Sequence, residues 1–215
     1  EKLNILINNY KPDFIFHLAA QSLVKKSLDE PIITWKTNTL GTINILESLR
    51  NLKKNCSVVL ITSDKCYKNL ETNRGYTEND ILGGNDPYSA SKAAAELAIE
   101  SYIKSFFSKK IKNINIGIAR AGNVIGGGDW SPNRLVPDCM RSVQKRKKLI
   151  LRSPHSTRPW QHVLEAISGY LFLAYYLSKN NNYKYKYEAF NFGPNKNNNF
   201  SVLDLIKSMK KKWNK

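Results

Sequence analysis

Cysteine is scarce in this chain, and long apolar runs are absent. The three cysteines among its 215 residues, Cys56, Cys66 and Cys139, match no zinc or redox spacing. An odd, scattered set is typical of free thiols in a reducing compartment, so the sequence predicts a cytoplasmic protein without a metal site. No run approaches the roughly 18 apolar residues of a membrane span, and no signal peptide opens the sequence, so we expect no membrane partner.

Acidic residues are also few. The chain carries 34 Lys and Arg against 17 Asp and Glu, a formal net charge of +17. Such a surplus raises nucleic-acid binding as an alternative. The lysines are spread along the chain, however, and no nucleic-acid-binding signature accompanies the clusters at residues 145–148 and 210–212. We therefore expect weak nonspecific adhesion at low salt and no specific nucleic-acid partner.

Apolar strands and amphipathic helices alternate along the first half of the chain. We expect strands over residues 14–20, 57–62 and 113–119, and helices over residues 31–52 and 88–107. Regular alternation of this kind predicts a parallel sheet with right-handed crossovers. The predicted fold class is therefore α/β, a Rossmann-like doubly wound parallel sheet, and the 41% hydrophobic content supports a packed core.

The second half is less regular. We expect helices over residues 134–144 and 163–177, strands over residues 149–152 and 189–193, and a final helix capped by Ser201. Asparagine-rich stretches at residues 180–182 and 195–199 predict polar loops. This irregular order of elements indicates a smaller C-terminal part that follows the main sheet.

A glycine-rich turn between a first strand and a first helix is missing. The strand at residues 14–20 ends in small residues, and an apolar stretch that suits the tail of a helix precedes it. The run of three glycines, Gly126-Gly127-Gly128, lacks the strand and helix that flank a phosphate-binding turn. We therefore expect the chain to begin partway into a dinucleotide-binding fold, incomplete at its N-terminus.

A tyrosine and a lysine four positions apart, Tyr88 and Lys92, are the most informative pair. Helical spacing puts them on one face, where the ammonium can lower the phenol pKa from its usual value near ~10. Such a phenol can remove a hydroxyl proton while hydride leaves the same carbon. The spacing alone is common by chance, but Pro87 is suited to the first turn of a helix there, and Asp86 or Ser89 is suited to cap it.

A polar cluster follows the strand over residues 57–62. Ser63, Asp64 and Lys65 come directly after Thr62, at the carboxyl end of that strand. Ligands of doubly wound sheets bind beyond the carboxyl ends of the strands. We therefore expect these side chains to lie near Tyr88 and to take part in the same chemistry.

Several longer strings carry a family resemblance over essentially the whole chain. The strings are Phe16-His17-Leu18-Ala19-Ala20-Gln21-Ser22, Thr62-Ser63-Asp64-Lys65-Cys66-Tyr67, Asp86-Pro87-Tyr88-Ser89-Ala90-Ser91-Lys92, Gly126-Gly127-Gly128-Asp129-Trp130 and Arg158-Pro159-Trp160-Gln161-His162. With them the chain resembles the extended short-chain dehydrogenase/reductase family and, within it, the CDP-glucose 4,6-dehydratases.

The resemblance implies a reaction and a cofactor. Bound NAD would take hydride from C4 of the glucosyl ring of CDP-glucose while Tyr88, assisted by Lys92, takes the hydroxyl proton. Ser63 would hydrogen-bond the C4 oxygen, and Asp64 would protonate the departing C6 hydroxyl. Lys65 departs from the broader pattern, in which a glutamate commonly follows the aspartate. It would abstract the C5 proton only with a depressed pKa.

The resemblance also implies binding roles and a division of the chain. Residues 1–118 would form the NAD-binding part with the catalytic residues, and residues 119–215 mainly the substrate-binding part. The implied NAD contacts are Leu18, Ala19, Ala20, Asn38, Tyr88 and Lys92. The implied substrate contacts are Asn123, Arg134, Arg158 and Trp160, the arginines because guanidinium pairs bidentately with phosphate. Arg152 is a weaker third arginine candidate. A homodimer or homotetramer is expected.

Two alternatives stay open at this point. A sibling dehydratase or epimerase would act on a dTDP-, GDP- or UDP-sugar, and an assay of each nucleotide sugar separates these substrates. A noncatalytic scaffold would keep the fold without the cofactor, a reading that the missing glycine-rich turn supports.

Overall fold

The structure, a computed structural model, describes residues 1–72, 74–179, 186–195 and 200–213. The chain forms two units. The larger unit contains Glu1–Ala121 and Ser168–Phe192, and the smaller unit contains Gly122–Ile167 and Gly193–Lys215. The predicted loop at residues 180–182 lies outside the described residues, and so does the predicted loop at residues 195–199 except for Asn195.

A four-stranded parallel sheet forms the centre of the larger unit. Its strands, in spatial order, are β1 (Phe14–His17), β2 (Cys56–Ile61), β3 (Ile114–Ala121) and β7 (Ala189–Phe192). Successive residues of β2 are buried on both faces, as expected for a covered parallel sheet. The α/β prediction is confirmed. The predicted strand over residues 14–20 is shorter, because the chain leaves the sheet after His17.

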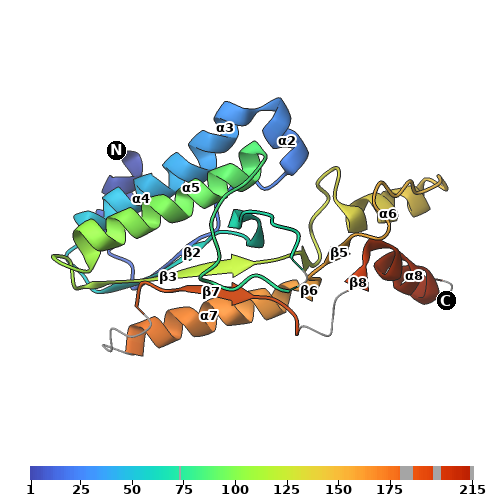
Figure 1. Cartoon of the computed structure of the whole chain (residues 1–215). Helices are drawn as coiled ribbons and strands as arrows, with labels where there is room; N and C mark the ends of the chain where they lie inside the picture. Colours follow the sequence, from blue (N-terminus) through green and yellow to red (C-terminus); the bar gives the residue numbers. More distant parts are fainter. Residues whose placement is uncertain (73, 180–185, 196–199, 214–215) are drawn as a thin grey trace. The chain divides into compact units, whose positions relative to one another are not determined.

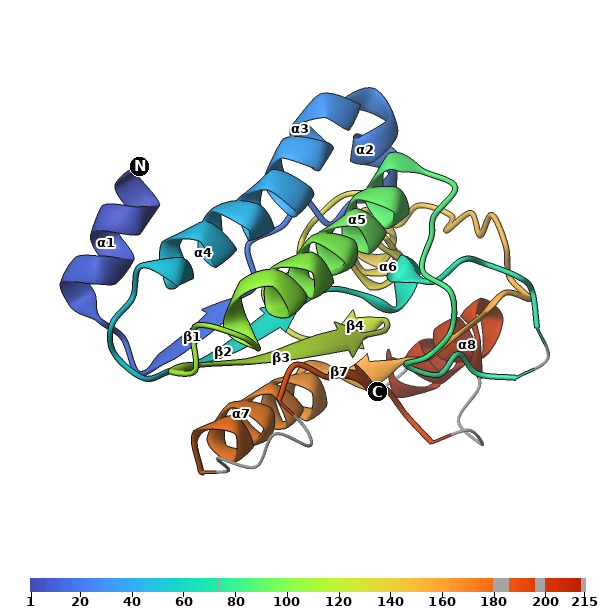
Figure 2. The same ribbon diagram turned by 60° about the vertical axis from the view of Figure 1, so that its left-hand side comes forward.

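Helices cover both faces of this sheet (Figures 1 and 2). On one face lie α4 (Gly41–Arg50) and α5 (Pro87–Tyr102), and α1 (Lys2–Tyr10) packs against α4. On the other face lies α7 (Val163–Lys179), whose part from Ser168 onward belongs to this unit. Gly117 of β3 permits the close approach of α7, because a Cβ there would lie 3.0 Å from Leu173 and Leu177. The core is mainly aliphatic, built from residues such as Leu46, Leu49, Val58, Ile99, Ile114 and Ile116, with the aromatic Phe107 among them.

The predicted helix over residues 31–52 is not a uniform α-helix. It consists of α3 (Pro31–Trp35), a π-helical turn η1 (Lys36–Leu40) and α4, and a short helix α2 (Val24–Asp29) precedes it. A second π-helical turn, η3 (Ile103–Phe107), extends α5. Such turns are rare and are frequently found at functional sites, and η1 contains the buried Asn38.

The smaller unit has little regular structure. Two short pairs of strands join β4 (Val124–Ile125) to β6 (Gln161–His162) and β5 (Thr157–Arg158) to β8 (Phe200–Ser201). Its helices are α6 (Leu135–Gln144), α8 (Val202–Trp213) and the first turn of α7. Ser201 caps α8 as predicted, since its Oγ accepts a hydrogen bond from the Asp204 amide.

The predicted strand over residues 149–152 is wrong. None of these four residues, all of them described, belongs to a strand. The Ile150 side chain is 85% exposed, so this short apolar run has neither a ladder partner nor a core to enter. A short apolar run alone does not specify a strand.

Three features of the structure concern the predictions made from composition: the cysteines, membrane-spanning helices and metal-binding groups. All three cysteines are free and buried. No helix among the described residues is long and apolar enough to cross a membrane. Across the same residues, no group of three or more His, Cys, Asp and Glu side chains is arranged to hold a metal ion.

Candidate functional site

The start of α5 fixes the position of Tyr88. Asp86 caps the helix, and its Oδ1 accepts hydrogen bonds at 3.0 Å from the backbone amides of Tyr88 and Ser89. Pro87 occupies the first turn, where its missing N–H costs nothing. Gly84 allows the preceding loop to pass close by, because a Cβ there would lie 2.4 Å from the Ala90 nitrogen. The predicted cap is confirmed.

Lys92 lies one turn beyond Tyr88, and both side chains are buried. They are 8% and 6% exposed, respectively. Lys92 Nζ donates a long hydrogen bond of 3.4 Å to the carbonyl oxygen of Ile61, the last residue of β2. Burial lowers the pKa of Lys92 to about 8, although the nearby Glu96 carboxylate acts to raise it. A weakly bonded, partly desolvated ammonium beside a phenol is the arrangement that promotes phenol ionisation.

Ser63, Asp64 and Lys65 lie at the carboxyl end of β2, on a 3₁₀ turn, η2 (Asp64–Cys66). Ser63 Oγ donates to Asp64 Oδ1 at 3.1 Å and accepts from the Lys65 amide at 3.2 Å. This turn packs against α5, with Cys66 and Ala93 in one small apolar cluster. The five predicted catalytic residues therefore come from two adjoining segments of the larger unit.

Asn38 ties the segment after β1 to α5. Its Oδ1 accepts from the Gln21 amide at 2.8 Å, and its Nδ2 donates to the Gln21 carbonyl at 3.0 Å and to Ser91 Oγ at 2.9 Å. Residues 18–20 connect β1 to this clamp, and the Leu18 side chain is 57% exposed. Asn38 thus holds the backbone after β1 in place, and the NAD contacts of Leu18, Ala19, Ala20 and Asn38 remain predictions.

His17 at the end of β1 is a neutral neighbour of this site. Burial and the positive charge of Lys92 lower the pKa of His17 to about 4. Its Nε2 lies 3.2 Å from Thr42 Oγ1. An uncharged imidazole here leaves the positive charge to Lys92.

Sequence reasoning missed two buried charged residues beside the site, Glu96 and Arg120. They form an ion pair with side chains 2% and 5% exposed, and Thr62 donates to the same carboxylate at 2.5 Å. A signal was available: Glu96 is four residues beyond Lys92 on the buried face of α5, and Arg120 is the one charged residue of a largely apolar strand. Charges at such positions are seldom buried without a partner.

The four predicted substrate residues line one cavity of the smaller unit. The cavity measures about 390 Å³, and Asn123, Arg134, Arg158 and Trp160 all contribute to its wall. Arg134 Nε lies 3.2 Å from Asp129. The Trp160 indole nitrogen is buried and, among the described residues, finds no acceptor. The cavity therefore combines cations with a donor that is not otherwise used, while the role of these residues remains a prediction.

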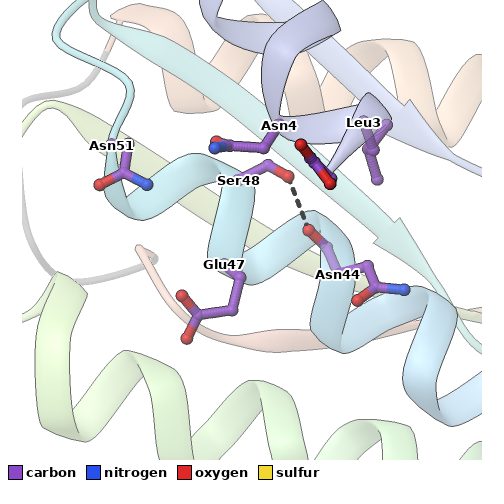
Figure 3. A pocket seen from close by; sticks show the side chains of 7 residues that line it. Leu3, Asn4, Asn44, Glu47, Ser48 and Asn51 are labelled. Atoms are coloured by element: carbon purple, nitrogen blue, oxygen red, sulfur yellow. Dashed lines mark hydrogen bonds between the residues drawn. The ribbon is translucent and has the colours of Figure 1, made fainter.

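A second hollow lies on the larger unit between α1 and α4 (Figure 3). It measures about 220 Å³ and is lined mostly by polar side chains, among them Asn4, Asn44 and Ser48. The Ser48 hydroxyl donates to the Asn44 carbonyl within α4. None of the residues that the sequence singled out lines this hollow.

Comparison with characterised sequences identifies relatives along nearly the whole chain. The model of the family described as GDP-mannose 4,6 dehydratase matches residues 1–212. A CDP-glucose 4,6-dehydratase of Salmonella typhimurium is 45% identical over 99% of this chain and 60% of its own length. A CDP-paratose 2-epimerase of Salmonella typhi is 27% identical over 94% of this chain and 63% of its own length. The chain thus spans about 60% of the length of the first of these relatives.

Solved structures share the fold. A dTDP-glucose 4,6-dehydratase from Streptomyces venezuelae superposes with a TM-score of 0.79 at 22% identity, covering 98% of this chain and 59% of that one. A UDP-glucuronic acid 4-epimerase from Bacillus cereus gives a TM-score of 0.82 at 23% identity, covering 100% and 63%. With the parallel sheet, the buried tyrosine–lysine pair and the family model matched over residues 1–212, the chain belongs to the GDP-mannose 4,6 dehydratase family of the extended short-chain dehydrogenases/reductases.

Proposed function

We propose that this chain provides the catalytic part of a sugar-nucleotide 4,6-dehydratase that converts CDP-D-glucose to CDP-4-keto-6-deoxy-D-glucose and water. The observation that carries the proposal is the 45% identity to a CDP-glucose 4,6-dehydratase over 99% of this chain. The buried Tyr88–Lys92 pair beside Ser63 and Asp64 supplies groups suited to each proton transfer.

NAD is the proposed cofactor, and the residues of the larger unit fit it. Small residues Ala19 and Ala20 follow β1, where they permit close approach of a ligand to the backbone. Among the described residues, Lys92 donates a single hydrogen bond, a long one to the Ile61 carbonyl. Its ammonium therefore retains donors for a ribose hydroxyl. When bound, NAD would accept hydride from C4 of the sugar and return it to C6.

Tyr88 would take the C4 hydroxyl proton. Its phenol is buried one turn from the Lys92 ammonium, and low-dielectric surroundings strengthen the stabilisation of phenolate by that charge. Ser63, itself buried, would donate a hydrogen bond to the C4 oxygen once its hydroxyl turns from Asp64. Lys92 would also orient the cofactor ribose, and Asn38 would hold the segment after β1.

Asp64 and Lys65 would perform the elimination. The C4 ketone acidifies the C5 hydrogen, so that a base can remove that proton and an acid can protonate the departing C6 hydroxyl. Asp64 would be the acid and Lys65 the base, and the proton that Lys65 takes from C5 would return to C5 when hydride is added at C6. The adjacent backbone positions of these residues on η2 support a common target.

The cavity of the smaller unit would bind the nucleotide. Arg134 and Arg158 would pair with the diphosphate, Asn123 would hydrogen-bond it, and the Trp160 indole nitrogen would donate to an acceptor of the ligand. On this proposal residues 1–118 hold NAD and the catalytic groups, and residues 119–215 mainly hold the substrate.

We further propose a cytoplasmic homodimer or homotetramer. Apolar side chains exposed on neighbouring helices support self-association, namely Ile32, Ile33, Leu40 and Leu97. Free, buried cysteines agree with a reducing compartment.

Turnover of four nucleotide sugars tests the proposal. The protein, expressed from its natural reading frame and supplied with NAD, is assayed by mass spectrometry for loss of water from CDP-glucose, dTDP-glucose, UDP-glucose and GDP-mannose. We expect CDP-glucose to react fastest, and Tyr88→Phe to slow the reaction by about 10²- to 10⁴-fold because the base is lost.

Tyr102→Phe is the matched control. It makes the same change on the same helix, at a phenol that donates to Glu47 instead of lining the site. Turnover should stay near that of the unmodified protein. Undiminished turnover in Tyr88→Phe, or faster turnover of another nucleotide sugar, would contradict the proposal.

A further inference from the structure

A buried ion pair closes off the carboxylate nearest to Lys92. Arg120 Nε donates to Glu96 Oε1 at 2.8 Å, and Arg120 Nη2 donates to Glu96 Oε2 at 2.6 Å. Thr62 donates the third hydrogen bond of this carboxylate, which is the second one to Oε1. Both oxygens of Glu96 are therefore bonded to partners on β3 and at the end of β2, and the carboxylate has little remaining capacity for another donor.

The far side of the guanidinium is fixed as well. Arg120 Nη1 donates to the Tyr67 hydroxyl at 2.8 Å and to the Glu78 carbonyl at 2.9 Å. Tyr67 in turn donates to Asn191 Oδ1 at 2.7 Å. These bonds join β3, β7 and the segment after η2, so Arg120 cannot leave Glu96 without breaking several buried hydrogen bonds.

Sequence spacing alone would pair Glu96 with Lys92. The two residues are four apart on α5, the separation at which lysine and glutamate side chains meet on a helix. In the structure Lys92 instead donates to the Ile61 carbonyl, and no ion pair between Lys92 and Glu96 forms among the described residues. Arg120 has replaced Lys92 as the partner of this carboxylate.

We propose that Arg120 is a positioning residue: by holding both oxygens of Glu96, it keeps that carboxylate from pairing with Lys92 and leaves the Lys92 ammonium available to Tyr88. The inference deepens the proposed function, on which its catalytic meaning rests. The geometric part stands alone, because it concerns only the charges around Tyr88 and Lys92.

The groups that face the pair come from several elements. The charged or titratable ones are His17 of β1, Glu96 of α5 and Arg120 of β3, together with the residues of η2, namely Asp64, Lys65 and Cys66. The other helices on α5 bring polar residues that do not titrate in this range, namely Ser27, Thr34, Asn38 and Thr39. From α4, Glu47 accepts hydrogen bonds from Tyr102, at the far end of α5, and from Arg50 of its own helix. Glu96 is therefore the principal anion that could approach Lys92 along α5.

The apparent pKa of Tyr88 depends on this arrangement of charges, and it can be measured without cofactor or substrate. Tyrosinate formation is followed by ultraviolet difference spectroscopy, and each protein is compared with its own Tyr88→Phe counterpart. Arg120→Gln frees Glu96 to pair with Lys92, so the apparent pKa of Tyr88 should rise by about one unit. Glu96→Gln removes the anion and leaves the cations, so that pKa should fall.

Two further variants control the result. Thr62→Val removes a hydrogen bond to the same carboxylate without changing any charge, and the titration of Tyr88 should not move. Should Arg120→Gln fail to fold, Arg120→Lys keeps the buried charge but gives up the two-point contact, and we expect a smaller upward shift.

Opposite shifts in the two single variants support the inference. A network that only holds the fold together would change the melting temperature and leave the titration where it is. Shifts of the same sign, or none, would overturn the proposal. Lack of turnover in the unmodified protein would bear on the proposed function alone, since the titration requires no reaction.

Discussion

The two units differ most in what they bury. The larger unit encloses a mainly aliphatic core and, within it, polar groups such as Asn38, Ser91, Lys92, Glu96 and Arg120. In the smaller unit only Pro137, Cys139 and Ala166 are buried among the described residues, and its strands are two residues long. Asn38, Ser91, Glu96 and Arg120 are thus held by packing and by two or more hydrogen bonds each, whereas Lys92 is held by packing and one long hydrogen bond.

Net positive charge, in contrast, is concentrated in the smaller unit. The smaller unit holds about a third of the residues but more than half of the net positive charge, most of it on exposed lysines and arginines. The two units are therefore suited to different parts of the proposed function. Groups that transfer protons are fixed in a rigid interior, and groups that attract an anionic ligand stand on a lightly packed surface.

Replacing Lys92 with methionine gives the sharpest test of the buried polar groups in the larger unit. Lys92→Met should lower turnover by about 10²- to 10³-fold, because the phenol loses the charge that favours its ionisation. It should also stabilise the protein at neutral pH, by about 3 kcal/mol, because burial lowers the pKa of Lys92 from 10.5 to about 8. Turnover and chemical unfolding at several pH values check both effects.

The pH dependence of that gain has a defined sign. Between pH 8 and pH 10.5 the unfolded chain holds a proton on Lys92 that the folded chain has released, so the unmodified protein gains stability as pH rises through this window. The advantage of Lys92→Met should therefore shrink there. Lys104→Met, at an exposed lysine of η3, is the control and should change stability by less than about 0.5 kcal/mol. A destabilised Lys92→Met would contradict the argument.

Much of the larger unit was predictable because its signals are local. Continuous apolar runs marked β2 and β3, and the Asp86-Pro87 start marked α5. Periodicity could not reveal the π-helical turns η1 and η3, since one extra residue per turn leaves no local trace. The Glu96–Arg120 pair was missed for a different reason: it joins residues 24 apart on separate elements, and only tertiary structure brings them together.

The smaller unit was less predictable, and the reason is physical. The predicted strand at residues 149–152 rested on three apolar residues, which can be exposed where no sheet is near to cover them. The residues proposed to contact substrate were nevertheless found along one cavity. Their selection came from family resemblance and from guanidinium chemistry, neither of which depends on secondary structure.

A conservative change in the cavity of the smaller unit should separate binding from stability. Arg158→Lys keeps the charge and loses the two-point contact with phosphate, so the KM for CDP-glucose should rise about 10-fold while the melting temperature stays unchanged. Steady-state kinetics and a thermal melt are the measurements. Arg152→Lys is the matched control, because Arg152 is exposed and does not line the cavity. Equal effects of the two changes would remove Arg158 from the proposed site.

The smallest effects are expected at the exposed end of α8. Lys210, Lys211 and Lys212 are exposed in its last turn, where they favour the helix dipole only weakly in salt. Replacing all three with glutamine should change the free energy of unfolding by less than about 1 kcal/mol and leave turnover intact. It should nevertheless weaken retention on immobilised DNA at low salt, because each lysine lost removes one phosphate contact and its counterion release. If turnover fell instead, these lysines would act on the substrate, and the contrast between a fixed interior and a merely attractive surface would fail at this helix.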